Sequence, residues 1–353
     1  MSAPITSASQ PFIHAHYADI LCQLAEDKGV SRQTLLTGSG IRPAMLEHPD
    51  NLISAPKFIT LCRESLAHSG DPALGLELGL RLKFTTHGPL SQAAVSSENL
   101  KQAIAVLIKY CRIRFVYMAL SFFTDGEEAV LQLDVMHEVD DLHRFSVDVL
   151  MASLMDVNQL LFGNQLTRGG RCQFAFPEPE DVAPYRALFG ERVRFGCETN
   201  QLRFQREFLD LPLVLSNPVT RRVAEAQCEE QMRTMEAAAS AAERVERLLA
   251  STREGRLPGL EQVAEQLMVS PRTLRRQLAE EGLKFKQLQD RIRHKRSLVL
   301  LRRPELTLDA VADALGYSDP SNFARAFRKW EGMAPSVWRQ ASLKFQGEGQ
   351  SSR

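Results

Sequence analysis

The feature that most constrains this chain is a pattern of apolar residues that occurs twice in its C-terminal third. In the first copy, at positions 260–282, apolar residues recur at helical spacing on two successive segments: Leu260, Val263, Ala264 and Leu267, then Leu274 and Leu278. Between the segments, Ser270 is a favourable N-cap residue and Pro271 suits the first turn of a helix. Gly282 then provides a stop. The pattern predicts a helix, a tight turn and a second helix.

A second copy occupies positions 307–331. Its apolar residues also fall on two helical faces: Leu308, Val311, Ala312 and Leu315, then Phe323 and Phe327. Gly316 makes the turn, Pro320 opens the second helix and Gly332 ends it. A long helical pattern joins the copies over residues 283–303. The sequence therefore predicts an all-α C-terminal domain with two helix-turn-helix units joined by a long helix.

The second helix of each unit is polar and basic on its outer face. The outward residues are Arg272, Thr273, Arg275 and Arg276 in the first unit, and Ser321, Asn322, Arg325 and Lys329 in the second. Arginine pairs favourably with guanine and asparagine with adenine in the major groove of DNA. A single pattern of this kind is common, and exposed arginines often only increase solubility. Two patterns in succession favour DNA binding, with the two helices in successive major grooves roughly 34 Å apart.

Charge is divided unevenly along the 353 residues. The net charge is zero, but residues 241–345 carry 20 Lys+Arg and 13 Asp+Glu, whereas residues 1–240 carry 22 and 29. A basic segment joined to an acidic one is typical of a nucleic-acid-binding domain attached to another domain. The hydrophobic content of 44% excludes wholesale disorder.

The N-terminal part mixes helical and strand patterns. Helical spacing occurs at 12–30, 56–66, 100–110 and 142–162, and strand-like runs occur at 115–124, 129–135, 171–176 and 192–195. Asp125-Gly126 separates the first two runs and predicts a hairpin. We expect an α+β regulatory domain over residues 1–213, a helical linker over 214–242, the DNA-binding domain over 243–342 and a disordered tail over 343–353.

The C-terminal motifs resemble those of the AraC/XylS family of bacterial transcription regulators. The segments LGYSDPSNFARAFRKWEGMAPSVWR and VAEQLMVSPRTLRRQLAEEG carry the resemblance, which covers roughly residues 243–342. Ser297 departs from it, because the connecting helix more often has alanine there. Residues 87–115 and 200–218 resemble the arabinose-binding-like N-terminal domain of a subset that lacks the small cupin barrel. The resemblance implies a transcription activator that contacts RNA polymerase, with an N-terminal domain that senses an effector or forms a dimer.

Neither catalytic nor metal-binding motifs are found. The sequence has no GxxxxGK[ST], GxSxG or HExxH motif, and its six cysteines lie far apart, as reduced thiols in a cytoplasmic protein do. No apolar run is long enough to span a membrane, and no signal sequence is found. We therefore expect no enzyme activity, no metal and no cofactor. Arg112, Arg114 and Tyr117 are weak candidates for binding an anionic or amino-acid-like effector.

These observations predict an effector-responsive, homodimeric activator of an operon for amino-acid or other carbon-source catabolism. Val219, Val223 and Ala226 form a helical stripe that suits either a partner helix or packing within the domain. Control of quorum sensing or virulence genes is the alternative. A regulator without a ligand, whose N-terminal domain only oligomerises, also remains open, as does an N-terminal enzyme.

Overall fold

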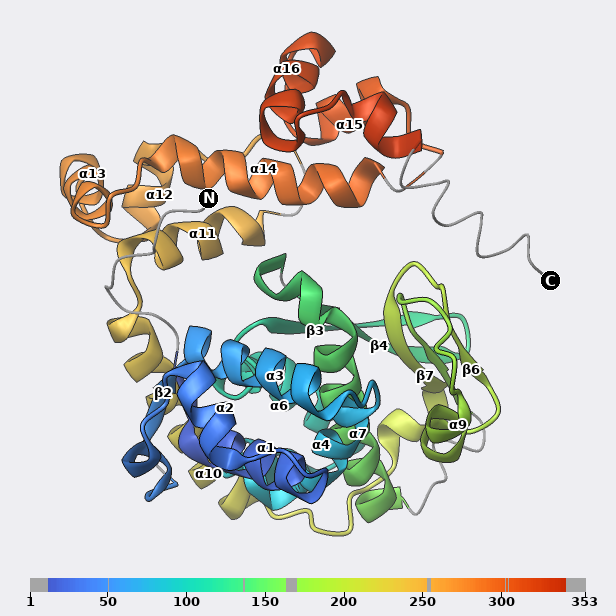
Figure 1. Cartoon of the computed structure of the whole chain (residues 1–353). Helices are drawn as coiled ribbons and strands as arrows, with labels where there is room; N and C mark the ends of the chain where they lie inside the picture. The colour runs from blue at the N-terminus through green and yellow to red at the C-terminus, as the bar shows by residue number, and fades with distance from the viewer. Residues whose placement is uncertain are drawn as a thin grey trace. The chain divides into compact units, whose positions relative to one another are not determined.

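The structure is a computed structural model that describes residues 12–49, 51–135, 137–162, 170–252, 255–301, 303 and 305–340. Its backbone contacts divide the chain into two compact units, one formed by Gln10–Ala237 and one that contains Ala238–Arg353. The first unit combines helices with sheets, and the second is helical (Figure 1). This confirms the fold class predicted from the sequence. The tail expected at 343–353 lies outside the described residues.

The N-terminal unit begins with helices around a small antiparallel sheet. These elements are β1 (Phe12–His14), α1 (Ala15–Asp27), α2 (Arg32–Ser39), β2 (Leu52–Ser54), α3 (Ala55–Ser69), α4 (Leu74–Arg81), α5 (Pro89–Val95) and α6 (Leu100–Tyr110). The sequence predicts one helix over 12–30, but Phe12–His14 is extended and pairs with β2. A strand of three residues is too short to give a periodic signal. The helix predicted from the residues that follow was therefore extended over this strand by mistake.

A five-stranded sheet follows. Its elements and the helices among them are β3 (Met118–Asp125), β4 (Glu128–Val135), α7 (His143–Phe162), β5 (Arg171–Gln173), α9 (Ala183–Phe189), β6 (Val193–Arg194) and β7 (Asn200–Gln205). The strand order is β3-β4-β7-β5-β6, and all neighbours are antiparallel except β5 and β6. The predicted hairpin is confirmed, since Asp125 pairs with Glu128 and Gly126 takes a positive φ of 58° in the turn.

Helix α7 runs through the core of this unit and packs closely on α4. A Cβ at Gly79 would lie 2.4 Å from the carbonyl oxygen of Val149, and one at Gly75 would lie 2.8 Å from that of Phe145. The two glycines therefore allow the helix backbones to approach. Among the described helices, α7 alone is long and apolar enough to cross a membrane, but 61% of its apolar window is buried inside the protein. It is a core helix.

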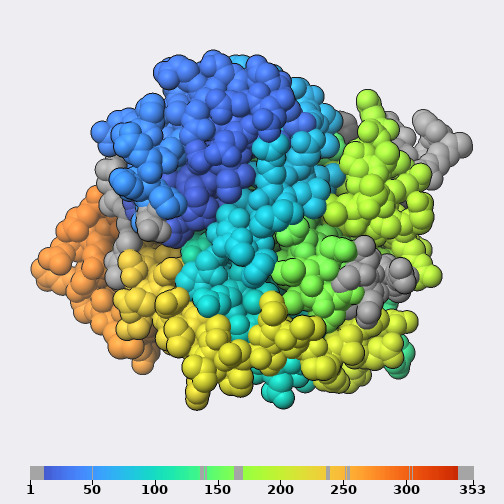
Figure 2. All heavy atoms as spheres, turned by 90° about the horizontal axis from the view of Figure 1, so that it is seen from below, coloured from blue at the N-terminus to red at the C-terminus, as the bar shows by residue number. Residues whose placement is uncertain are grey.

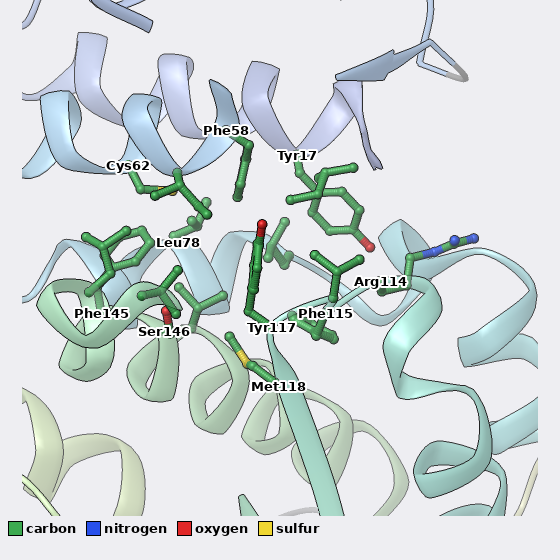
Figure 3. Close-up of a pocket in the computed structure, with 17 residues that line it drawn as sticks. Tyr17, Phe58, Cys62, Leu78, Arg114, Phe115, Tyr117, Met118, Phe145 and Ser146 are labelled. Carbon is green, nitrogen blue, oxygen red and sulfur yellow. The ribbon is translucent and has the colours of Figure 1, made fainter. Parts of the chain in front are cut away.

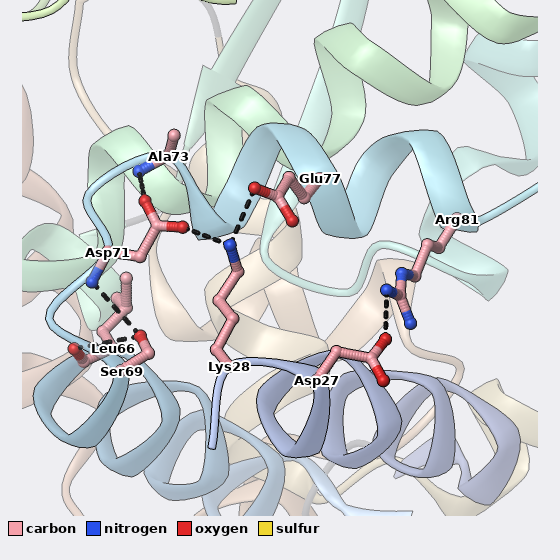
Figure 4. Close-up of polar contacts among 8 residues, drawn as sticks. All are labelled: Asp27, Lys28, Leu66, Ser69, Asp71, Ala73, Glu77 and Arg81. Atoms are coloured by element: carbon pink, nitrogen blue, oxygen red, sulfur yellow. Dashed lines mark hydrogen bonds and ion pairs between the residues drawn. The ribbon is translucent and has the colours of Figure 1, made fainter. Parts of the chain in front are cut away.

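Ion pairs connect α4 to the end of α1 (Figure 4). Lys28 Nζ lies 2.5 Å from Asp71 Oδ2 and 2.8 Å from Glu77 Oε1, and Arg81 pairs with Asp27 at 2.5 Å. Asp71 also accepts a hydrogen bond from the backbone N–H of Ala73 at the start of α4. These contacts fix the orientation of α4, whose other face packs on α7.

Helix α10 (Pro218–Ala238), which the sequence assigns to the linker, packs on the N-terminal unit. Ala224 and Cys228 are fully buried in a cluster with Leu90 of α5 and Val106 and Tyr110 of α6. Lys109 and Tyr110 also contact Glu229. The outer face of this helix lies on the surface beside the segment that contains α5 and α6 (Figure 2). The contacts explain why the first compact unit extends to Ala237.

The C-terminal unit has six named helices in its described residues. They are α11 (Ala241–Ser251), α12 (Leu260–Gln266), α13 (Pro271–Glu280), α14 (Phe285–Leu301), α15 (Leu308–Ala314) and α16 (Pro320–Glu331). Two apolar clusters hold them, one around Leu274 and Leu278, and one around Phe323 and Phe327. Helix α14 contributes residues to both clusters. The two units predicted from the sequence are thus both formed.

Candidate nucleic-acid interface and ligand pocket

Helix α13 presents a basic surface from a firmly held position. Leu274 and Leu278 are buried against the first cluster, whereas Arg272, Arg275 and Arg276 are exposed. Arg275 lies 3.4 Å from Glu261, and Arg276 lies 3.6 Å from Glu280. Both pairs are largely exposed, so each contributes little stability and leaves its arginine available for another partner.

Ser270 and Thr273 act together at the start of α13. The Ser270 hydroxyl accepts a hydrogen bond from the backbone N–H of Thr273 and lies 2.8 Å from its hydroxyl. Thr273 is a candidate contact residue in the sequence, and its hydroxyl is part of the N-cap in the structure. The cap satisfies a donor that the first helical turn leaves unpaired.

Helix α16 presents the corresponding surface of the second unit. Phe323 and Phe327 are buried, and Ser321, Asn322, Arg325 and Lys329 are exposed. Arg325 donates a hydrogen bond of 2.5 Å to Oδ1 of Asn322. The backbone N–H of Ser321 donates to Asp319, which caps the helix. The residues predicted from the sequence are therefore exposed on both second helices, except Thr273, which is half-buried.

The turns of the two units differ at the second position after the first helix. Met268 has a positive φ of 54° and is 93% exposed, whereas Gly316 has a φ of 77°. A Cβ at Gly316 would lie 2.6 Å from Cα of Arg256. Arg256 was not predicted as the neighbour of this turn, because nothing in the local sequence pattern relates it to Gly316.

The connecting helix α14 is fixed at several points. Arg296 donates hydrogen bonds to the carbonyl oxygens of Leu249, at 3.0 Å, and Thr252. Ser297, which departs from the family pattern, is fully buried, and its hydroxyl donates to the carbonyl of His294 at 2.6 Å. The serine thus satisfies its own polar group within the helix. The 17 residues of α14 span about 26 Å.

A mostly apolar cavity of about 80 Å³ lies inside the N-terminal unit (Figure 3). Its walls come from α1, α3, α4, α7 and the segment before β3. The residues that line it include Tyr17, Phe58, Cys62, Leu78, Arg114, Phe115, Tyr117, Phe145 and Ser146. Of the three effector candidates, Arg114 and Tyr117 line this cavity and Arg112 does not.

Arg114 contributes its aliphatic stem to the cavity, and its guanidinium group points away from it (Figure 3). Nε donates to the carbonyl of His87 at 3.0 Å, and Nη1 donates to the carbonyl of Ile113 and to Nε2 of His14. Only 7% of Arg114 is exposed, and burial lowers the pKa of its guanidinium. In the described part of the chain, no carboxylate pairs with it.

Hydrogen bonds beside the cavity determine which nitrogen atom of His87 carries the proton. Nδ1 lies 2.8 Å from the Tyr17 hydroxyl, and Nε2 lies 3.0 Å from the Ser153 hydroxyl. Ser153 donates to the carbonyl of Leu82, so it accepts from Nε2 of His87, and Nδ1 accepts from Tyr17. Burial, together with Arg114, lowers the pKa of His87 to about 4. The imidazole is therefore neutral at neutral pH.

Asp148 of α7 is a second buried polar residue. Its Oδ2 accepts a hydrogen bond of 2.7 Å from Tyr185, and Arg144 lies 3.6 Å away, whereas Oδ1 has no hydrogen-bond partner among the described residues. Burial raises the pKa of this carboxyl to about 7, and the hydrogen bond from Tyr185 opposes the rise. The described residues contain no group of histidine, cysteine and acidic side chains that could hold a metal ion.

The comparisons with known proteins agree with this geometry. Residues 29–213 match the arabinose-binding domain of AraC transcription regulator, N-term, and residues 263–341 match a helix-turn-helix domain. The first match alone covers more than half of the chain. The chain belongs to the AraC family of transcription regulators. It belongs to the subset with the arabinose-binding-like N-terminal domain, as the sequence motifs predict. It is a DNA-binding regulator.

Individual relatives cover nearly the whole of this AraC-family chain. The ornithine utilization regulator of Pseudomonas aeruginosa is 36% identical over 97% of this chain and 100% of its own length. An uncharacterized HTH-type transcriptional regulator of Mycobacterium tuberculosis is 30% identical over 92% of this chain and 96% of its own. The crystal structure of the transcriptional regulator CdpR from Pseudomonas aeruginosa covers 91% of this chain and 98% of its own, with 24% identity and a TM-score of 0.43.

Proposed function

We propose that this regulator is an effector-responsive activator of an operon for the breakdown of an amino acid or another carbon source. The observation that carries the proposal is the combination of two complete helix-turn-helix units with a separate α+β unit that contains a cavity. The name of the ornithine utilization regulator, which is similar over its full length, supports catabolic control. An effector shifts the equilibrium between a promoter-competent and an incompetent state.

The promoter contacts are assigned to α13 and α16. We propose that Arg272, Arg275 and Arg276 contact bases or phosphates in one major groove, and that Asn322 and Arg325 contact the next. Ser321 and Lys329 contact the backbone beside them, and Thr273 acts through the cap it shares with Ser270. The domain limits follow the sequence, with 1–213 as the regulatory domain and 243–342 as the DNA-binding domain. Bound at the promoter in the cytoplasm, the protein recruits RNA polymerase and has no catalytic role.

Homodimerisation is proposed to use the outer face of α10. Val219 and Val223 are 61% and 56% exposed there, and Ala226 is exposed one turn further along. Arg222 precedes Ala226 by four residues, and Glu230 follows it by four. Two antiparallel copies that cross at Ala226 therefore place Arg222 of each copy opposite Glu230 of the other, as an isologous interface requires. The small side chain at the crossing allows close approach.

A charge exchange tests this dimer. Arg222→Glu places two acidic residues opposite each other and should shift the protein toward the monomer in analytical ultracentrifugation. Adding Glu230→Arg should restore the dimer, because the pair is then present with reversed charge. If both variants and the wild type have the same dimerisation constant, the helix face is not the interface.

The experiment that tests the function is a map of the protein's binding sites in its host, by immunoprecipitation and sequencing. A few strong sites beside one catabolic operon, whose transcription falls when the regulator is deleted, are the expected result. Many scattered sites would contradict the proposal of a local catabolic regulator and would support the alternative of quorum-sensing or virulence control. Increased transcription after deletion would contradict activation.

A further inference from the structure

The charges around the N-terminal cavity restrict what it can hold. Among the described residues that line it, none is aspartate or glutamate. Arg114 is the one charged residue of this described lining, and its guanidinium group points away from the cavity (Figure 3). Apolar side chains from four helices form most of the remaining wall. The described lining therefore offers a charged ligand group no partner of opposite charge.

The guanidinium group of Arg114 cannot easily turn into the cavity to pair with an anionic ligand group. Its guanidinium donates to two backbone carbonyls, of His87 and Ile113, and to the His14 ring. Turning it into the cavity would break these hydrogen bonds and leave buried acceptors unpaired, which is unfavourable. A carboxylate in the cavity would also lose its hydration without compensation. The same argument excludes an ammonium group, since no described residue of the lining offers it a carboxylate.

Two hydroxyl groups, of Ser146 and Tyr117, belong to residues that line the cavity. Ser146 of α7 lines the cavity and is only 9% exposed. Its hydroxyl makes no hydrogen bond with the described part of the chain. The side chain of Tyr117 extends into the cavity between α3 and α7 (Figure 3). Because the Ser146 hydroxyl faces a mostly apolar cavity without a hydrogen-bond partner among the described residues, a ligand that hydrogen-bonds to it is stabilised.

We infer that this cavity binds an uncharged, largely apolar molecule of about one ring, with a single hydroxyl or carbonyl group that hydrogen-bonds to Ser146. This inference rests on the proposed effector-responsive function and names the chemical class of the effector. The volume of about 80 Å³ is below the ~150 Å³ of a dry cavity that accepts benzene. A single ring therefore requires the half-buried side chains of Phe58 and Tyr117 to move outward when the ligand binds.

Four small molecules separate the chemical classes. Benzyl alcohol, benzylamine and benzoate are similar in size but neutral, cationic and anionic at neutral pH, and ornithine carries both signs of charge. We expect benzyl alcohol to raise the thermal unfolding midpoint of the full chain in a saturable way, since a ligand of the native state stabilises it. The three charged molecules should leave the midpoint unchanged at the same concentration.

Two serine variants test whether the ligand occupies this cavity. Ser146→Ala should weaken benzyl alcohol binding by about threefold to tenfold, the effect of one lost hydrogen bond. Ser65→Ala is the control, because Ser65 is a buried helical serine whose hydroxyl has no hydrogen-bond partner in the described part of the chain, and it does not line the cavity. It should leave binding unchanged. Equal weakening by both variants would overturn the assignment to Ser146.

The other outcomes distinguish the ligand class from the function. Stabilisation by benzoate, benzylamine or ornithine, without stabilisation by benzyl alcohol, would overturn the uncharged class and leave an effector-responsive regulator in place. No stabilisation by any of the four would overturn the inference for this cavity. The map of bound promoters is independent of these measurements, so its failure would instead count against the proposed function.

Discussion

The Tyr17 hydroxyl and Nδ1 of His87 lie 2.8 Å apart inside the N-terminal unit, although 70 positions separate them in the chain. The hydrogen bonds continue through Nε2 of His87 to Ser153 on α7. Residues from α1, from the segment before α5 and from α7 are thus connected beside the cavity. The arrangement favours a neutral imidazole, because Nδ1 accepts a hydrogen bond from Tyr17 and burial disfavours a charge on the ring.

The first prediction concerns this histidine. Its native pKa of about 4 lies below the ordinary histidine value of 6.5, so its contribution to stability is complete above pH 6.5 and is lost as the pH falls toward 4. We expect the wild type to lose on the order of 2–3 kcal/mol through His87 between pH 7 and pH 4. Urea unfolding of wild type and His87→Gln at both pH values measures it. A difference between the two proteins that stays constant with pH would contradict the account.

The second prediction concerns Asp148 and has the opposite sign. Its native pKa of about 7 lies above the ordinary aspartate value of 3.8, so the native state favours the protonated carboxyl and loses stability as the pH rises from about 4 to 7. Asparagine resembles the protonated acid. From pH 5 to pH 8, Asp148→Asn should gain on the order of 2 kcal/mol in unfolding free energy relative to wild type. If urea unfolding shows no gain, neighbouring groups compensate the cost of burying the charged carboxylate, which would contradict the prediction.

The third prediction concerns the contact between α4 and α7. Gly79→Ala places a Cβ against the backbone of Val149 and should reduce the unfolding free energy by about 1–3 kcal/mol or more. Gly38→Ala is a control within α2, where the new Cβ meets only the end of the Glu64 side chain. It should be neutral or stabilise by up to about 1 kcal/mol, because alanine favours the helix. Equal effects in thermal unfolding would contradict close helix packing.

The fourth prediction compares the turns of the two helix-turn-helix units. Met268 has a positive φ and an exposed side chain, so Met268→Gly should relieve strain and stabilise the C-terminal unit by up to about 1 kcal/mol. Gly316→Ala should destabilise it, since the positive φ of Gly316 is combined with a close contact to Arg256. Thermal unfolding of the full chain tests both. Stabilisation by Gly316→Ala would contradict the prediction, because it would mean that the backbone at Arg256 moves away without loss of stability.

The C-terminal architecture follows from local residues and was therefore predictable. Ser270 and Asp319 cap their helices, and Leu274 and Phe323 mark the buried faces, so both units could be placed from sequence. The N-terminal unit depends on distant contacts instead. Strand β7, for example, lies between β4 and β5 and was not predicted, because its neighbours are far away in the chain.

The ligand site was predictable only in part for the same reason. The segment with Arg114 and Tyr117 was singled out for its composition, and both residues line the cavity. The direction of the Arg114 guanidinium depends on His14 and His87, which no local pattern relates to it. Ser146 was missed because a serine within an apolar helix gives no signal by itself.

The most direct test of the central claim is selection of DNA from a random pool by the full chain, repeated with Arg276→Ala and with Arg325→Ala. The account predicts two sequence elements about 10 base pairs apart, one for each recognition helix. Each variant should lose one element and about 1–3 kcal/mol on the wild-type sequence, whereas the control Arg192→Ala, exposed on the N-terminal unit, should lose neither. A single element, or variants that select the wild-type sequence unchanged, would contradict recognition by both units.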